Sequence, residues 1–223
     1  MAITFVGSAL GTVTTIGQTL GTVAITISGA NPLLVVSIMS DISTTASGVG
    51  FNGNSMTQAA SGSLSSESSS IWYLEAPPAG AGSVIATVTN SGSDRVLLAQ
   101  NYAGVLQTGA LAVAGSAVGT SAAISFIGTA SEGSCLMVDA AFGNGDPGTV
   151  GAGQTTLTNQ DLGFFFVGAS YEILGAATTI GTMSWGQVSD AWVTSVAAFK
   201  SAATGGGGIT IAGWKSLLGV GQG

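Results

Sequence analysis

The sequence predicts an all-β chain that folds as an antiparallel β-sandwich of jelly-roll or Greek-key type, with extended N- and C-terminal arms. Short alternating or continuously apolar runs recur along the chain, and turn residues separate them about every 8–12 residues. No stretch combines an apolar stripe at helical spacing with charged residues opposite, so no amphipathic helix is predicted.

The first elements follow from local patterns. Residues 1–19 are expected to form an N-terminal arm or an edge strand. Residues 22–28 (TVAITIS) alternate between branched apolar and small residues, which is typical of a strand. Residues 29–32 (GANP) predict a turn, and residues 33–40 (LLVVSIMS) predict a strand that is buried on both faces or central in a sheet.

The next segments are expected to alternate between loops and strands. Residues 44–54 are rich in glycine and residues 61–70 (SGSLSSESSS) are polar and of low complexity, so both are expected to be loops, the second one exposed. Residues 70–89 predict a strand, a turn at Ala76-Pro77-Pro78-Ala79-Gly80 and a second strand. Residues 95–102 (RVLLAQNY) predict another strand.

The pattern then begins again near residue 105. The matched pairs are residues 123–127 with 24–27, residues 134–141 with the strand at Leu33, residues 163–174 with the strand at Trp72, and residues 189–199 with 93–102. This internal doubling predicts two related sets of strands.

The doubling defines the expected domain. A sandwich is expected over residues 20–203, with pseudo-repeats of about 20–104 and 105–203. The repeats could form two sandwiches or share one larger sandwich. The shared sandwich is favoured, because no charged or proline-rich linker separates them.

Residues 204–223 are expected to be a glycine-rich C-terminal arm. Four consecutive glycines, Gly205 to Gly208, are typical of a flexible tether, and the alternating segment ITIAGW follows them. This segment could fold back on its own domain, pair with the sheet edge of a neighbouring subunit, or stay disordered. The candidate partner-binding residues are its large apolar side chains: Ile209, Ile211, Trp214, Leu217 and Leu218.

Charge excludes several classes of partner. Only 6% of the residues are charged, against roughly 25% in ordinary globular chains, and the net charge is -7. Binding of nucleic acid or of an anionic membrane needs many cations, whereas this chain has three. No apolar run is long enough for a membrane-spanning helix. The sparse charge predicts that neighbours cover much of the surface, in a homo-oligomer or a larger assembly, although an ordinary low-charge extracellular domain is the alternative.

Catalysis and cofactors are not expected. The chain has no histidine, which excludes histidine-based triads and histidine metal sites. Two Gly-x-Gly-x-x-Gly matches, at 48–53 and 143–148, precede no predicted helix, so dinucleotide binding is not predicted.

Acidic side chains offer two further candidate sites. Asp139, Asn144 and Asp146 could ligate calcium, but they lack the ordered spacing of a calcium loop, and a plain turn is favoured. A glycosidase would need a carboxylate pair, and the candidates for it are Glu67, Glu75, Asp94 and Glu132. The scarcity of aromatic residues argues against this activity, so we expect no enzyme and no bound metal.

The remaining conspicuous side chains are expected to be structural. Trp72, Trp185 and Trp192 lie inside strand patterns, which favours core packing, whereas Trp214 lies in the tail and could anchor a partner. Cys135, the single cysteine, is expected to be a small buried residue.

Several motifs together resemble a family of β-sandwich domains in phage and prophage structural proteins. They are the apolar strand at residues 33–36, the turn at residues 50–57, IWYL at residues 71–74 before APPAG, and the closing strand at residues 192–199. The resemblance covers about residues 20–200 and implies a head decoration or fibre component, with nothing catalytic to carry over.

The sequence therefore predicts a non-enzymatic virion protein that decorates or cements a capsid. It would bind the major capsid protein or other virion proteins through its arms. The start of the chain does not resemble a signal peptide, so assembly in the host cytoplasm and location on the capsid surface are expected. The alternatives are a receptor- or glycan-binding fibre or adhesin module, and a self-assembling extracellular filament subunit.

Overall fold

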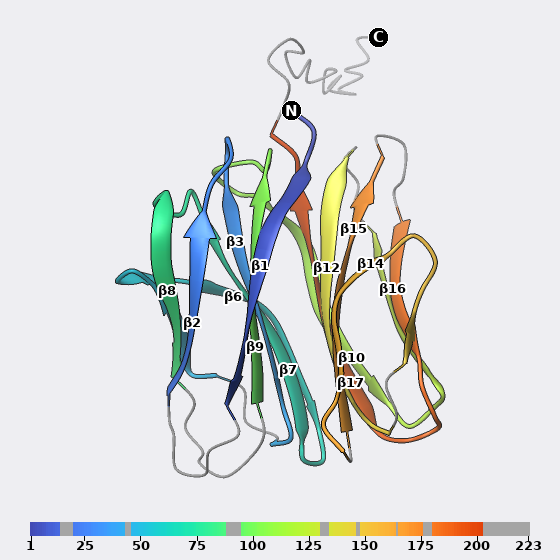
Figure 1. Cartoon of the computed structure of the whole chain (residues 1–223). Helices are drawn as coiled ribbons and strands as arrows, with labels where there is room; N and C mark the ends of the chain where they lie inside the picture. Colours follow the sequence, from blue (N-terminus) through green and yellow to red (C-terminus); the bar gives the residue numbers. More distant parts are fainter. Residues whose placement is uncertain are drawn as a thin grey trace, which may run out of the picture.

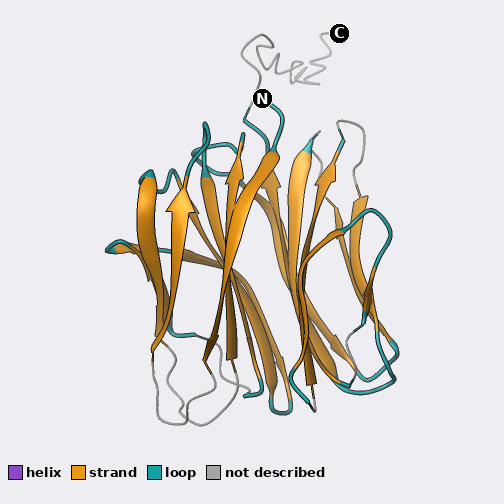
Figure 2. Ribbon diagram, in the orientation of Figure 1, coloured by secondary structure: helices purple, strands orange, loops and turns teal. Residues whose placement is uncertain are grey.

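The protein is described by a computed structural model, which covers residues 1–13, 20–42, 46–87, 95–129, 134–145, 148–163, 165–175 and 180–202. Throughout these ranges the regular structure is β-strand, as the sequence predicts (Figure 2). Within the same ranges, no helix is long and apolar enough to cross a bilayer.

The first half of the chain forms two antiparallel sheets (Figure 1). One has the order β1-β9-β3-β7-β6 and the other β2-β8-β4-β5. The strands are β1 (Thr4–Val13), β2 (Leu20–Ile27), β3 (Leu33–Ser40), β4 (Gly48–Phe51), β5 (Asn54–Ser55), β6 (Thr57–Leu64), β7 (Glu67–Glu75), β8 (Gly80–Thr87) and β9 (Arg95–Ala103).

The second half repeats this topology. Its sheets have the orders β10-β17-β12-β15-β14 and β11-β16-β13. The strands are β10 (Leu111–Gly119), β11 (Ala123–Thr129), β12 (Cys135–Asn144), β13 (Thr149–Val150), β14 (Thr155–Asp161), β15 (Phe165–Leu174), β16 (Ile180–Gly186) and β17 (Trp192–Lys200). Each pair of segments matched in the sequence occupies the same place in its half.

Even the irregularities coincide between the halves. The register of β1 against β9 shifts between Phe5 and Gly7, and that of β10 against β17 shifts between Leu111 and Val113. Each shift falls at the same end of the first strand of its half, so Gly7 and Val113 occupy corresponding positions. In the described residues no sheet mixes strands of both halves.

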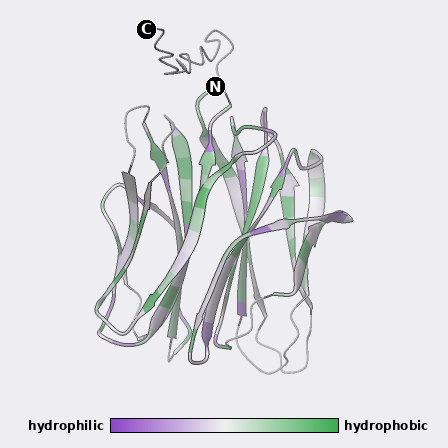
Figure 3. Cartoon of the chain, turned by 180° about the vertical axis from the view of Figure 1, so that it is seen from behind, coloured by the Kyte–Doolittle hydropathy of each residue, from purple (hydrophilic) through white to green (hydrophobic). Residues whose placement is uncertain are grey.

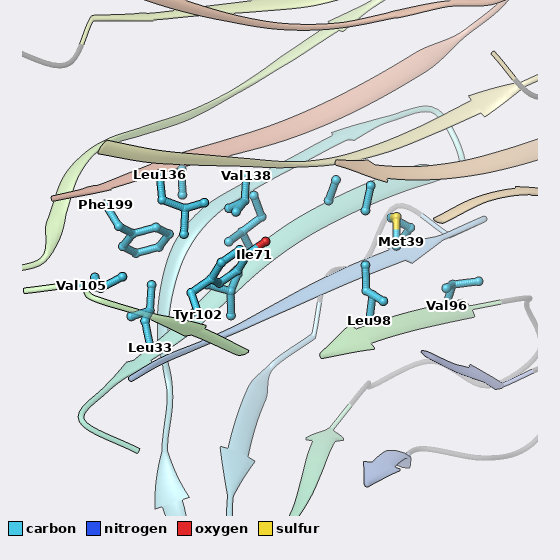
Figure 4. Close-up of a cluster of buried hydrophobic side chains, with 14 of the residues drawn as sticks. Leu33, Met39, Ile71, Val96, Leu98, Tyr102, Val105, Leu136, Val138 and Phe199 are labelled. Atoms are coloured by element: carbon cyan, nitrogen blue, oxygen red, sulfur yellow. The ribbon is translucent and has the colours of Figure 1, made fainter. Parts of the chain in front are cut away.

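The four sheets stack as layers, with the two five-stranded sheets facing each other in the middle. Their facing side chains form one core, in which Leu33 and Tyr102 of the first half lie opposite Leu136 and Phe199 of the second (Figure 4). Each fully buried side chain of this kind stabilises the fold by about 1.5–3 kcal/mol. This contact makes the two halves one packed unit.

The inner sheets also pack against the outer sheets, so their strands are buried on both faces. In β3, Leu34 and Val36 face Val84 and Phe51 of the outer sheet, while Leu33 faces the central core. The continuous apolar run at residues 33–40 follows from this arrangement. Strongly hydrophilic residues occupy only short stretches of the strands (Figure 3).

The expectation of an exposed loop at residues 61–70 is wrong. This segment is the β6–β7 hairpin, and Glu67 and the three serines after it are buried. Ser69 faces β17, where its Oγ lies 2.8 Å from the Oγ of Ser195, and Ser70 accepts a hydrogen bond from Trp72 Nε1. Serine is small enough to lie between two packed sheets once its hydroxyl has a partner.

The glycine-rich segment at residues 44–54 is also more regular than expected. Its described part holds β4 and β5, which pair across a two-residue turn at Asn52 and Gly53. Both residues have positive φ, 48° and 82°, as a tight hairpin turn requires. Residues 1–13, expected as an arm or an edge strand, contain β1, which lies at the edge of its sheet next to β9.

Candidate functional site

The candidate partner-binding residues Ile209, Ile211, Trp214, Leu217 and Leu218 lie outside the described residues, as does the whole expected C-terminal arm. The described chain ends at Ala202, whose carbonyl accepts a hydrogen bond from the N-terminal amine of Met1 at 2.9 Å. The backbone N–H of Ala202 donates to Gly104 O at 2.8 Å, and that of Gly104 donates to Ala30 O at 2.8 Å. The described chain therefore ends close to Gly104 and to the turn between β2 and β3 that contains Ala30.

The candidate glycosidase carboxylates are not brought together. Glu67 and Glu75 lie at opposite ends of β7, and eight steps along a strand correspond to about 26 Å. A glycosidase needs its two carboxyl groups within roughly 5–10 Å of each other. Asp94 and Glu132 lie outside the described residues.

Glu67 and Glu75, the two candidate carboxylates that the structure describes, instead accept hydrogen bonds from other parts of the chain. Glu75 accepts hydrogen bonds from the backbone N–H groups of Gly109 and Ala110, at 3.2 and 2.6 Å, in the segment between the two halves. Buried Glu67 accepts one from Asn144 Nδ2 at 2.8 Å and so links β7 to β12. Both contacts join the first half of the chain to the second.

The candidate calcium ligands are separated as well. Asp139 is buried in the middle of β12, Asn144 binds Glu67, and Asp146 lies outside the described residues. Among the described residues, no cluster of three acidic or cysteine side chains could hold a metal ion.

Asp139 is the centre of a buried hydrogen-bond network that sequence reasoning missed. Its carboxylate accepts from Trp185 Nε1 at 2.8 Å and from the backbone N–H of Ser170 at 2.6 Å, and it lies 2.9 Å from Ser170 Oγ. Gln154 Nε2 donates to Ser170 Oγ at 2.7 Å, and the side-chain Oε1 of Gln154 accepts from the backbone N–H of Ser184 at 2.8 Å. The network joins β12, β15 and β16 across one sandwich.

Burial and hydrogen bonding act on Asp139 in opposite directions. Burial raises the pKa of this carboxyl to about 7, while the hydrogen bonds from Trp185 and Ser170 lower it. The signal in the sequence was a single carboxylate within an otherwise apolar run at residues 135–142, which could have indicated a buried and hydrogen-bonded acid.

The tryptophans and the cysteine pack as predicted. Trp72, Trp185 and Trp192 are 7%, 2% and 6% exposed and belong to the cores between inner and outer sheets. Cys135 is 1% exposed, and burial raises the pKa of its thiol.

An open groove of about 440 Å³ lies along the free edges of β1 and β2. In the described residues β1 pairs only with β9, and β2 only with β8, so each strand leaves one edge unpaired. The lining residues are small or apolar and none is charged: Val6, Gly7, Ser8, Ala9, Ala24, Ile25, Thr26, Ser28, Ala81 and Gly82.

Charged side chains are nearly absent from the described surface. Asp161 and Asp190 are exposed, and every other charged residue in the described ranges is half-buried or buried. Large apolar side chains such as Ile127, Val188 and Ile85 are, in contrast, 67%, 51% and 47% exposed.

Comparison with known proteins adds little. No family model and no curated protein matches the sequence. Among solved structures, the chain is similar to one described as "Crystal Structure of the STIV MCP", with 9% sequence identity and a TM-score of 0.26. That alignment covers 90% of this chain and 96% of the other. A similarity of this size carries no argument about fold or function.

Proposed function

We propose that this protein is a non-enzymatic structural component of a virion, which decorates or cements a capsid by binding neighbouring subunits. The observation that supports this most is the described surface, which exposes Asp161 and Asp190 as its charged residues but several large apolar ones. Roughly 25% of the residues in ordinary soluble domains are charged, against 6% here. A surface without that charge is suited to being covered by other subunits.

The construction of the sandwich suits a mechanical role. Four sheets in layers share apolar cores, and side-chain contacts such as the part-buried Asn144–Glu67 hydrogen bond and the buried Ser69–Ser195 contact connect the two halves. A rigid body of this kind transmits load between its neighbours. The arms would supply the attachment, and the described chain ends at Ala202, whose carbonyl accepts a hydrogen bond from the N-terminal amine of Met1.

The proposal is tested by isolating particles from infected or expressing cells and locating this chain in them by mass spectrometry and electron microscopy. We expect the chain in particles at a fixed ratio to the major capsid protein, and a chain lacking residues 205–223 to lose occupancy. A chain absent from the particles would overturn the proposal, and unchanged occupancy after the deletion would remove the role of the arm.

A self-assembling filament subunit is the second candidate, because a tail that binds an edge of the next copy forms an open, head-to-tail contact. Filaments formed by the purified chain without any capsid would favour it.

A further inference from the structure

The groove exists because the first half lacks side chains that fill the same place in the second half. At the position of Gly7, the second half has Val113, which is partly buried and packs, as does Phe126 of β11, against a cluster that contains Cys135 and Met137. A side chain on Gly7 would meet no atom within 4 Å, and φ of Gly7 is not positive. The first sandwich therefore has room for an apolar side chain that its own strands do not supply.

The walls of the groove are suited to a β-strand. The unpaired edges of β1 and β2 present main-chain N–H and C=O groups, and an added strand would satisfy one such row. Next to the groove, Asn101 is fully buried and donates to Ser28 O at 3.0 Å, but its Oδ1 has no hydrogen-bond partner among the described residues. The uncharged lining would accept small and branched side chains.

The C-terminal segment has the matching chemistry and starts nearby. Residues 209–214 read ITIAGW, which begins with three β-branched residues and carries no charge. The described chain ends at Ala202, next to the end of β2, and seven steps from there to Ile209 span at most about 25 Å.

We propose that the groove between β1 and β2 is the receptor site for residues 209–214 of a neighbouring copy, which pair with a free edge and place an apolar side chain over Gly7. The assignment of a neighbouring donor rests on the proposed function, because only donation between copies links subunits. It adds to that function the surface on which the arm is received.

Disulfide trapping in the full-length chain tests the proposal. One variant carries Thr26→Cys in the groove wall and a second carries Thr210→Cys in the tail; the two are mixed, assembled and mildly oxidised. Cys135 is buried and its thiol has a raised pKa, so it does not compete. The control replaces Thr26→Cys by Ser125→Cys, on the exposed face of the equivalent strand β11.

We expect the Thr26–Thr210 cysteine pair to form an intermolecular disulfide at least tenfold more than the Ser125 control. Equal yields would overturn the groove as the receptor. A chain that carries both Thr26→Cys and Thr210→Cys tests the source of the strand. An intramolecular disulfide between these two cysteines within assemblies would overturn donation between copies. Assemblies that form without the groove disulfide would leave the structural function intact and overturn this inference alone.

Filling the groove gives an independent check. Gly7→Val restores the residue type of the second half and should reduce the groove disulfide at least tenfold without lowering the midpoint of urea unfolding. Gly175→Val, at another glycine with open space around it, is the matched control and should leave the disulfide unchanged. If Gly7→Val forms as much of the groove disulfide as the original residue does, the proposed binding position of the strand over Gly7 is contradicted.

Discussion

Trp185 Nε1 donates a hydrogen bond of 2.8 Å to the carboxylate of Asp139, and both residues are at least 98% buried. The contact joins an inner sheet to an outer sheet within the second half. It places a titratable group at the centre of one of the cores, and the stability of the fold should therefore depend on pH.

The free energy of unfolding should fall as pH rises from about 4 to 7. The pKa of Asp139 is raised from 3.8 to about 7 by burial, so the folded state binds a proton that the unfolded state has already released in this range. The loss is of the order of 4 kcal/mol above pH 7. Urea unfolding at several pH values measures it.

Asp139→Asn is the reference for that measurement. The amide keeps the shape of the carboxyl but does not titrate, so the difference between the two proteins isolates the contribution of Asp139. The variant should lose about 1–3 kcal/mol of stability near neutral pH or below, because one N–H donor loses its acceptor. Identical pH profiles for the two proteins would contradict this role of Asp139.

Trp185→Phe should raise the pKa of Asp139 further. The indole N–H stabilises the ionised carboxylate, and phenylalanine cannot donate that hydrogen bond. Carboxyl carbon NMR shifts of Asp139 would report the change directly. Trp192→Phe is the control, since Trp192 donates to Ser121 and not to Asp139, and it should leave the titration in place.

Phe199→Ala should destabilise both halves together. Phe199 is fully buried in the central core and contacts the ring of Tyr73 from the other half, with ring centroids 5.3 Å apart. Loss of such a ring costs about 3–5 kcal/mol. Fluorescence of Trp72 and of Trp185, each in a variant where it is the only tryptophan, should show one shared transition at lower urea. Ile127→Ala, at a 67% exposed residue, should change little.

Glu75→Gln should cost about 1–2 kcal/mol without affecting either core. The carboxylate accepts from two backbone N–H groups, at Gly109 and Ala110, and an amide can accept only through its one oxygen. Thermal unfolding measures the loss. Gln58→Glu, on exposed β6, is a surface control of similar size and should stay within about 0.5 kcal/mol of the original protein.

Much of the fold could be predicted from the sequence because strands leave periodic patterns. Alternation at residues 22–28 and the apolar run at residues 33–40 correspond to β2 and β3, and the repeat near residue 105 marks the second copy of the topology. The pattern does not reveal which sheet packs against each face of a strand. A strand buried on both faces looks the same in a shared sandwich as in two sandwiches packed together.

Other features depend on tertiary contacts that leave no local signal. The serines of β7 read as an exposed loop, since nothing near them in sequence shows that Ser195 supplies a partner. Asp139 read as a turn or cation ligand, because its partners Ser170 and Trp185 are 31 and 46 residues away. The groove could not be foreseen either, because it reflects the absence of a filling side chain at Gly7.

The most direct test of the central claim, that this chain acts by covering and joining other subunits, is the mass and composition of the native particles that contain it. We predict that the chain sediments with capsid-sized particles in a fixed ratio to their main component, and that electron microscopy places its layered sandwich against neighbouring subunits. A chain recovered only as a free monomer, absent from every particle, would contradict the claim.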